Sequence, residues 1–222
     1  MTQRPRTIFV ATANRGKLHE MRALFAPHGY DVALYPGYES PPEGERSYAD
    51  NAALKARTLH ERLRAEQRAE AVLADDSGLE VDALDGRPGV VTADYGGTQA
   101  TWPQRRAKLL AELAASGRRD RRARFVCWMH YIDAQGREFG SLGTVDGEIA
   151  AVERGGLGFS FDPVFLYLPA GRTFAELSDE EKNRVSHRAI ATAAIVAAID
   201  AAAAGLNDGA AALRGTHGGQ RE

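Results

Sequence analysis

The sequence lacks three features that would each indicate a particular class of protein. It contains one cysteine, Cys127, so an intramolecular disulfide framework and a site built from several thiolates are both excluded. No stretch reaches the roughly 18 uninterrupted apolar residues that span a bilayer, and the apolar run near Met1 is a poor signal peptide. The formal net charge of -2 gives no overall attraction to nucleic acid or to an anionic membrane. These absences predict a cytoplasmic protein without a membrane or nucleic-acid partner.

What the sequence does contain is the composition of an ordinary globular domain. Its 222 residues are 44% hydrophobic and 26% charged, which provides a sizeable core and rules out disorder or coiled coil as the dominant state. There is neither an internal repeat nor an interdomain linker. We therefore expect a single domain over residues 1–205, followed by a mobile tail over residues 206–222, which are rich in glycine and alanine.

The order of the apolar segments predicts an α/β fold. The apolar run at residues 7–13 leads at once into helical spacing, so a buried strand, a tight turn and a helix are expected there. Shorter runs predict strands at 31–35 and 71–74, and residues 124–133 and 137–149 have the signature of a hairpin. Capping patterns start further helices at Ser47, Thr101 and Ser178, and a longer helix is expected from Ser186 to Gly205.

The turn before the first helix carries residues suited to a phosphate. Asn14 and Lys17 lie where the N–H groups of a helix start are free and the helix dipole is positive, and Lys17 adds a full charge. A polar turn with a solvated lysine explains the same spacing, so both interpretations stay open. Neither the P-loop pattern nor the dinucleotide-binding glycine pattern is present.

Two adjacent carboxylates follow the apolar run at residues 71–74. Because successive side chains of a strand point to opposite sides, only one of Asp75 and Asp76 readily faces a given cleft. A carboxylate at the carboxyl end of a strand can bind Mg²⁺ and orient or deprotonate a water. The alternative is a strand-to-loop turn with Asx hydrogen bonding.

The helix that begins at Ser47 offers a second acidic candidate. Asp50 is placed either to close a capping box with Ser47 or to point across a cleft at a metal. Asn51 and Lys55 share a face one turn apart, so this polar stripe either runs toward the same cleft or is simply solvated.

Two later segments combine aromatic rings with hydrogen-bonding groups. In a glycine-rich loop, Phe159, Phe161 and Asp162 suit stacking on a base, although phenylalanines of such a loop also commonly cover the core. A dense group of polar residues then occurs at a helix junction and comprises Lys182, Asn183, Ser186, His187 and Arg188. That density exceeds what a helix cap requires.

Two other groups of residues carry weaker signals. Arginines between residues 118 and 124 are interrupted by Asp120, and no aromatic residue lies among the first four, which favours a solvated loop over a nucleic-acid patch. The histidines have no ligand-like spacing, so we assign no metal to them.

Six segments, taken together and in order along the chain, indicate a protein family far more specifically than any one of them does. They are Ala11-Thr-Ala-Asn-Arg-Gly-Lys17, Asp50-Asn-Ala52, Ala74-Asp-Asp-Ser-Gly-Leu79, Pro88-Gly-Val90, Gly158-Phe-Ser-Phe-Asp-Pro163 and Lys182-Asn-Arg-Val-Ser-His-Arg188. Together they resemble the inosine triphosphate pyrophosphatase family, whose members hydrolyse deaminated purine nucleoside triphosphates such as ITP, dITP and XTP. The resemblance covers most of the chain, from about Ile8 to Ala191.

The resemblance implies a fold, a reaction and a set of site residues. The fold would be α/β, with a central mixed β-sheet flanked by helices and two lobes around a nucleotide-binding cleft, and the protein would be a homodimer. Mg²⁺ would be the cofactor for cleavage between the α and β phosphates, with Asp76 as general base and Asp50 and Asp76 as metal ligands. The residues implied to bind substrate are Thr12, Ala13, Asn14, Arg15, Gly16, Lys17, Ser77, Phe159, Ser160, Phe161, Asp162, Lys182, His187 and Arg188.

The same resemblance implies a basis for base selectivity. His187 and Arg188 would direct donors at the 6-oxo group of the base. Adenine carries an amino donor at that position, so a pocket that offers only donors leaves polar groups unpaired against it.

Four residues depart from the usual family pattern. Asp50 stands in place of glutamate, Ala13 and Ser160 in place of glycine, and Asp94 in place of arginine. Asp50 and Asp94 motivate the alternative of a catalytically weakened nucleotide-binding protein. A pyrophosphatase for other modified nucleotides is a further alternative.

Overall fold

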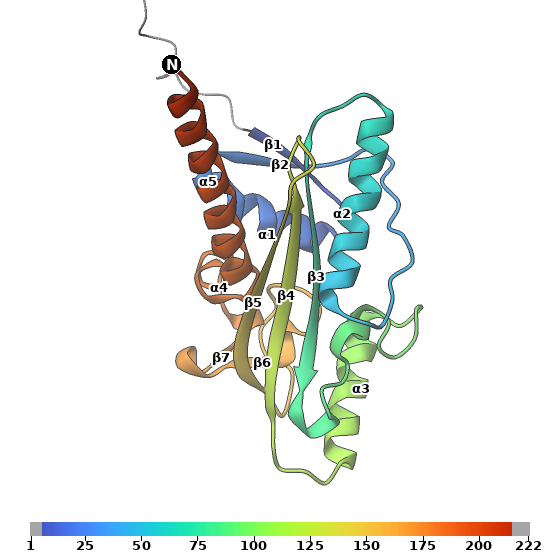
Figure 1. Ribbon diagram of the computed structural model, residues 1–222. Helices are drawn as coiled ribbons and strands as arrows, with labels where there is room; N and C mark the ends of the chain where they lie inside the picture. The colour runs from blue at the N-terminus through green and yellow to red at the C-terminus, as the bar shows by residue number, and fades with distance from the viewer. Residues whose placement is uncertain (1–5, 215–222) are drawn as a thin grey trace, which may run out of the picture.

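The computed structural model describes residues 6–214, which form one mixed sheet with helices on both faces (Figure 1). The strands are β1 (Arg6–Val10), β2 (Tyr30–Leu34), β3 (Ala71–Val81), β4 (Arg122–Ile132), β5 (Glu138–Ile149), β6 (Phe165–Tyr167) and β7 (Arg172–Thr173). The α-helices are α1 (Arg15–Phe25), α2 (Tyr48–Ala65), α3 (Trp102–Ala115), α4 (Asp179–Val185) and α5 (His187–Arg214).

The strand order in the sheet is β2-β1-β3-β4-β5-β6-β7. β1 pairs in parallel with β2 and β3, and every later pair is antiparallel. The long strands β3, β4 and β5 run from one end of the molecule to the other, with β1, β2 and α1 at one end and α3, β6 and β7 at the other (Figure 1). The predicted α/β class, with a mixed sheet and two lobes, is confirmed.

Alternation of side chains along β3 divides the upper core into two layers. Val72 and Ala74 pack with Leu59 and Leu63 of α2 on one face. On the other face, Leu73 belongs to a cluster formed with α1 and α5. Side chains of β3 alternate between the two faces, and both faces are covered. Each side chain therefore packs into the cluster on its own face.

One boundary differs from the sequence prediction in a way that matters for the site. We expected β3 to end at Ala74, but it continues to Val81 because Asp75 to Val81 pair with β4. The parallel partner β1 ends opposite Leu73. Asp75 and Asp76 therefore lie within a strand, next to the point at which β1 leaves the sheet, and the alternative of an Asx turn is wrong.

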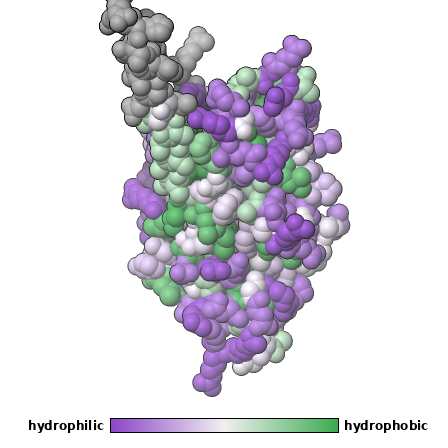
Figure 2. All heavy atoms as spheres, in the orientation of Figure 1, coloured by the Kyte–Doolittle hydropathy of each residue, from purple (hydrophilic) through white to green (hydrophobic). Residues whose placement is uncertain are grey.

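The last helix also differs from the prediction, which ended it at Gly205. It continues to Arg214, and the rest of the expected mobile tail, residues 215–222, lies outside the described residues. The segment His187–Gly205 has a mean hydropathy of 1.5 and meets the length and composition of a membrane span, whereas we expected none. Its inner face packs against the sheet through Ile195 and Ile199, and Figure 2 shows weakly hydrophobic surface along α5.

Because α5 packs closely on β5, replacement of Gly143 by alanine is expected to be strongly destabilising. A Cβ atom there would overlap the carbonyl oxygen of His187 and lie 2.5 Å from the Ala191 nitrogen, both of which are backbone atoms. We expect Gly143→Ala to lower the free energy of unfolding by about 3 kcal/mol, since backbone cannot yield as a side chain does. Gly156, where an added Cβ meets nothing within 4 Å, is the matched control. Equal midpoints of urea unfolding for Gly143→Ala and Gly156→Ala would contradict this close approach.

Candidate functional site

A cavity of about 210 Å³ lies between the two lobes, and most of the residues predicted to bind substrate line it. Among the predicted residues, those that line it are Thr12, Ala13, Asn14, Lys17, Asp76, Ser77, Phe159, Ser160, Asp162, Lys182, His187 and Arg188. The remaining predicted residues, Arg15, Gly16, Asp50 and Phe161, are absent from the lining. Segments distant in the sequence thus converge on one hollow.

The turn between β1 and α1 is fixed by its own side chains. Asn14 caps α1, because its Oδ1 accepts hydrogen bonds from the N–H groups of Gly16 (2.9 Å) and Lys17 (3.1 Å). Two of the N–H groups that we expected to be free are therefore already bonded, which corrects that part of the prediction. Arg15 is exposed outside the cavity, and Gly16 lies under the ring of Phe159. The cationic Lys17 side chain remains the charged group of this turn in the cavity.

Asp76 is held in the cavity wall by two residues of α2. Its Oδ2 accepts a hydrogen bond from Asn51 Nδ2 at 3.0 Å, and its Oδ1 lies 3.2 Å from Lys55 Nζ. All three side chains are buried, so solvation of the polar stripe on α2, the alternative considered above, is wrong. Burial raises the pKa of Asp76 above its ordinary value, against the opposing effects of Lys55 and of the Asn51 hydrogen bond.

The second acidic candidate is a different residue from the one the sequence suggested. Asp50 is exposed and accepts a hydrogen bond from the Ser47 hydroxyl at 2.8 Å, so its position supports capping and not a contact with the cavity. Glu43, in the loop before α2, lines the cavity instead, and its Oε1 lies 3.4 Å from Lys55 Nζ. Lys55 therefore bridges the carboxylates of Glu43 and Asp76. Sequence reasoning missed Glu43 because the loop contains several glutamates and no periodicity to distinguish them.

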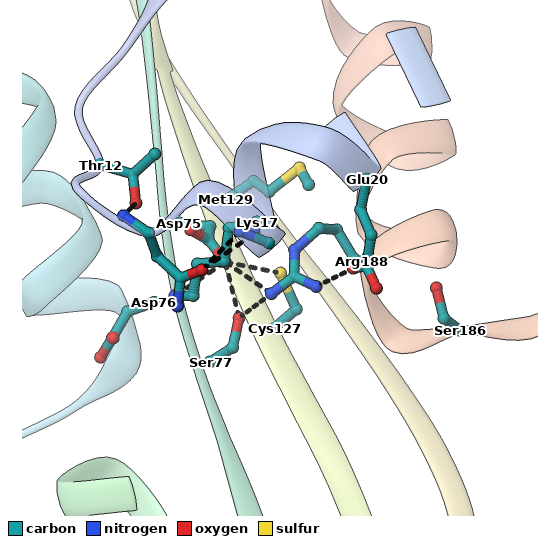
Figure 3. A network of polar contacts seen from close by, with 12 residues as sticks. Thr12, Lys17, Glu20, Asp75, Asp76, Ser77, Cys127, Met129, Ser186 and Arg188 are labelled. Carbon is teal, nitrogen blue, oxygen red and sulfur yellow. Dashed lines mark hydrogen bonds and ion pairs between the residues drawn. The ribbon is translucent and has the colours of Figure 1, made fainter. Parts of the chain in front are cut away.

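Asp75 points to the opposite side of β3 from Asp76, as alternation predicts, and lies in a buried ionic network (Figure 3). Its Oδ2 is 3.1 Å from Lys17 Nζ and 3.0 Å from Arg188 Nη2, and it accepts the Ser77 hydroxyl at 2.8 Å. Burial alone would raise the pKa of Asp75, but Lys17 and Arg188 outweigh it and hold the pKa far below its ordinary value. Asp75 is consequently a fixed anion behind the cavity.

The network continues through α1 to the junction of α4 and α5. Glu20, which is buried on α1, contacts Arg188 Nη1 with one carboxylate oxygen and Lys182 Nζ with the other at 2.8 Å. Lys182 Nζ also lies 2.5 Å from Asp162 Oδ2. Cations and carboxylates therefore alternate from Lys17 in the turn between β1 and α1 to Asp162 in the glycine-rich loop, and the sequence alone gave no sign of Glu20 as the link.

The aromatic wall of the cavity differs in part from the prediction. Phe159 lines it, but Phe161 is fully buried and packs edge-on against Trp102 with ring centroids 5.6 Å apart. The backbone turns into a short 3-10 helix at Asp162, which sends the Phe161 ring into the core. Trp102 and Phe125, two aromatic residues that we did not predict, line the cavity instead.

His187 and Arg188 both line the cavity, but they differ in which of their nitrogen atoms have hydrogen-bond partners. His187 stacks on Phe125 with centroids 4.8 Å apart, and its Nδ1 is buried without a hydrogen-bond partner among the residues that the structure describes. Burial, together with Arg188 and Lys182, holds the pKa of His187 well below its ordinary value, so the ring is neutral. Both terminal nitrogens of Arg188 are engaged, by Glu20 and by Asp75 with Ser77, while its Nε has no partner within the same part of the chain.

The arginine cluster before β4 is largely neutralised within the protein. Arg118 pairs with Asp85 at 2.8 Å, Arg124 with Glu80 at 2.7 Å, and Arg121 donates to the carbonyl of Ala150 at 2.7 Å. These contacts favour the interpretation of this segment as structural. Asp94 is exposed and outside the cavity lining, and nothing in the structure explains its charge.

The fold and the cavity define an α/β protein whose two lobes enclose a buried array of carboxylates, lysines and aromatic rings. Residues 8–198 match the model of the Ham1 family, and the chain belongs to this family. The resemblance inferred from the six segments is thereby confirmed.

Individual relatives agree with this assignment. The chain is 40% identical over 199 residues to the "dITP/XTP pyrophosphatase" of Bacillus licheniformis, covering 88% of this chain and 98% of the relative. It is 44% identical over 186 residues to the protein of the same name from Geobacillus kaustophilus, covering 82% and 88% respectively. Among solved structures, the Ham1 protein of Staphylococcus aureus is 34% identical with a TM-score of 0.74, covering 88% of this chain and 99% of that one.

Proposed function

We propose that this protein hydrolyses deaminated purine nucleoside triphosphates, such as dITP and XTP, to the monophosphate and pyrophosphate. The single observation that carries the proposal is the cavity, in which Asp76 and Lys17 face the same hollow as the aromatic wall and the buried donors. The names of the relatives, dITP/XTP pyrophosphatase, support the same conclusion. A role in removing damaged nucleotides in the cytoplasm follows from this activity.

The residues around Asp76 are suited to a magnesium ion. Mg²⁺ favours oxygen ligands and is commonly held by one or two carboxylates together with the phosphates of the substrate. Asp76 and Glu43 both line the cavity on either side of Lys55, and they supply such a pair. Among residues 6–205, whose side chains the structure describes, no group of three or more metal-binding side chains occurs.

The charge balance of the cavity gives a second reason to expect a cation. The positive side chains in its lining are Lys17, Lys55, Lys182 and Arg188. Three carboxylates, Glu43, Asp76 and Asp162, share the lining, and Glu20 and Asp75 pair with its cations from behind. A triphosphate therefore meets a surplus of only one positive charge in the lining. When bound, Mg²⁺ would add positive charge and offset the charge that develops on the leaving pyrophosphate.

The protein's own groups have separate tasks in this reaction. Asp76, with its raised pKa, would accept a proton from the attacking water, and Asn51 and Lys55 would keep its carboxylate in one orientation. Lys17 would contact the phosphates, with Asp75 fixing its ammonium group. His187, with a neutral ring, and Arg188 line the cavity together with Phe159, so these residues would contact the base.

Product analysis tests the proposal. The purified protein is incubated with Mg²⁺ and, separately, with dITP, XTP, ATP, GTP and dTTP, and pyrophosphate is resolved from orthophosphate. We expect pyrophosphate from dITP and XTP and little from the other three. Binding of dITP without turnover of any of the five would instead favour a nucleotide-binding protein that has lost catalysis. Turnover confined to dTTP would favour the alternative of a pyrophosphatase for other nucleotides.

Glu43 and Asp50 make a matched pair for testing the metal ligand. We expect Glu43→Gln to raise the Mg²⁺ concentration needed for half-maximal activity at least about tenfold, because one of two carboxylates is lost. Asp50→Asn should leave that concentration unchanged and cost about 1 kcal/mol or less of stability, as expected for a residue at a helix cap. Titration of dITP hydrolysis with MgCl₂ measures both. A Mg²⁺ requirement that changes only in Asp50→Asn would restore Asp50 as the ligand.

The homodimer predicted from the family resemblance stays a prediction. Sedimentation of the full chain measures it directly.

A further inference from the structure

The loop between β5 and β6 forms one wall of the cavity, and its first half is bonded to the segment after β7, where the Ala175 carbonyl accepts hydrogen bonds from the N–H groups of Gly156 and Leu157. Phe159 and Ser160 line the cavity, and the Phe159 N–H donates to Asp162 Oδ2 at 2.7 Å. The Phe159 ring lies over Gly16, where an added Cβ would be 2.9 Å from the ring. The centroid of the same ring is 5.0 Å from Lys182 Nζ. The position of this loop therefore decides where an aromatic face meets a bound base.

The backbone of this loop adopts an unfavourable conformation at the cavity. Ser160 has a φ of 60°, which is the left-handed region that residues with a Cβ atom rarely adopt. Its neighbour Gly158 is also left-handed, but glycine does so freely. A serine in this state persists only when surrounding contacts impose it. The question is which contact imposes it.

Bonds within the loop flank Ser160, and the contact to its own carbonyl from outside the loop comes from Arg106 on α3. Arg106 Nη1 donates to the carbonyl oxygen of Ser160 at 2.9 Å, and its Nε lies 3.0 Å from Glu153 Oε2 at the start of the same loop. The Arg106 side chain is 12% exposed, so this interaction is largely shielded from solvent. One guanidinium thus joins two points of the loop to a helix from a different part of the chain.

We propose that Arg106 is a positioning residue that holds the cavity loop, residues 153–160, in the conformation that receives the base. Arg106 itself is outside the cavity lining, so it acts through Ser160 and Phe159. The guanidinium donates a hydrogen bond to the Ser160 carbonyl and pairs by charge with Glu153, whose carboxylate lies 3.0 Å from Nε without the alignment of a hydrogen bond. The kinetic part of this proposal rests on the proposed function, whereas the conformational part does not.

Hydrogen exchange of the nucleotide-free protein tests the conformational part. In Arg106→Ala, exchange of the backbone amides in residues 153–160 is expected to rise by about tenfold relative to wild type, since the loop opens more often. Lys108→Ala is the matched control, because Lys108 is a cation on the same helix that pairs with Glu112 and lies outside the cavity lining. Unchanged exchange in Arg106→Ala, or an equal rise in Lys108→Ala, would overturn the proposal.

Steady-state kinetics with dITP test the consequence for binding. Arg106→Ala and Arg106→Gln should raise KM roughly tenfold, the size of one lost charge-assisted hydrogen bond, and leave kcat within about twofold. A general loss of structure would instead lower kcat with the fraction of folded protein. If the wild-type protein cleaves no nucleotide, the proposed function fails while hydrogen exchange still decides the role of Arg106. A fall in kcat at unchanged KM would also overturn the positioning role.

Discussion

Replacement of Asp76 by asparagine is expected to lower kcat for dITP by about 100- to 10,000-fold, the usual contribution of a positioned general base. The asparagine keeps the size of the side chain but cannot accept the proton of the attacking water. Burial raises the pKa of Asp76, which brings its basicity closer to what proton abstraction at neutral pH requires. Pyrophosphate release under saturating substrate measures the effect.

The control for this experiment separates catalysis from folding and binding. Asp50→Asn removes a carboxylate from the exposed first turn of α2, so it should retain wild-type kcat. Fluorescence titration with dITP at saturating Mg²⁺ should show that Asp76→Asn still binds nucleotide, because Glu43 remains as a proposed metal ligand and Lys17 and Phe159 are intact. Turnover of Asp76→Asn within a few-fold of wild type would exclude Asp76 as the base.

Replacement of Asp75 by asparagine is expected to act on stability instead, and by about 3 kcal/mol or more. Asp75 is completely buried against Lys17 and Arg188, and removal of its charge leaves two buried cations with a weaker partner. Asp179→Asn is the control, because Asp179 pairs with His19 at the surface and its side chain is 62% exposed. That change should alter stability by less than about 0.5 kcal/mol. Urea unfolding at neutral pH compares the two.

The pH dependence of the Asp75 effect has a definite sign. The pKa of Asp75 is lowered in the folded protein, so its contribution is complete above the pKa of an unfolded aspartate, about 3.9. This contribution to stability is lost progressively as the pH falls below about 3.9, because the unfolded chain then binds a proton that the folded protein does not bind. The difference in stability between wild type and Asp75→Asn should therefore shrink below about pH 4. A difference that grows toward acid would contradict a depressed pKa.

Local chemistry explains which parts of the fold could be predicted from the sequence. Ser47, Thr101 and Ser178 each cap the helix that their patterns indicated, because a cap depends on residues within one turn of the chain. The hairpin of β4 and β5 was equally visible, since its turn at residues 133–136 is a local signal. The extension of β3 to Val81 was not, because it depends on pairing with β4 some fifty residues later.

The site divides in the same way. Asn14 and Lys17 were found because they sit at a recognisable boundary between β1 and α1, and Asp76 because its carboxylate follows an apolar run in the sequence; all three line the cavity. Glu43 was missed because only the path of an irregular loop brings it to Lys55. Phe161 was misplaced because whether an aromatic ring faces a cleft or the core depends on the backbone around it.

Because Asp75 and Asp76 are adjacent in a central strand, the register of β3 determines which of the two carboxylates faces the cavity. A shift of β3 by one residue relative to β4 would turn every side chain to the opposite face, so that Asp76 would leave the face of the cavity and Asp75 would turn toward it. Charge alone would hardly oppose that exchange, since the two residues are chemically identical.

Gly78 opposes it sterically. A Cβ at this position would overlap the carbonyl oxygen of Gly89 and lie 2.6 Å from the Tyr48 hydroxyl, so a slipped strand that brought Ser77 or Leu79 there would collide with both neighbours. Because Gly78 has no side chain, it fits only the observed register and opposes misfolding into a shifted one. It thereby determines which of the two adjacent aspartates can reach a substrate.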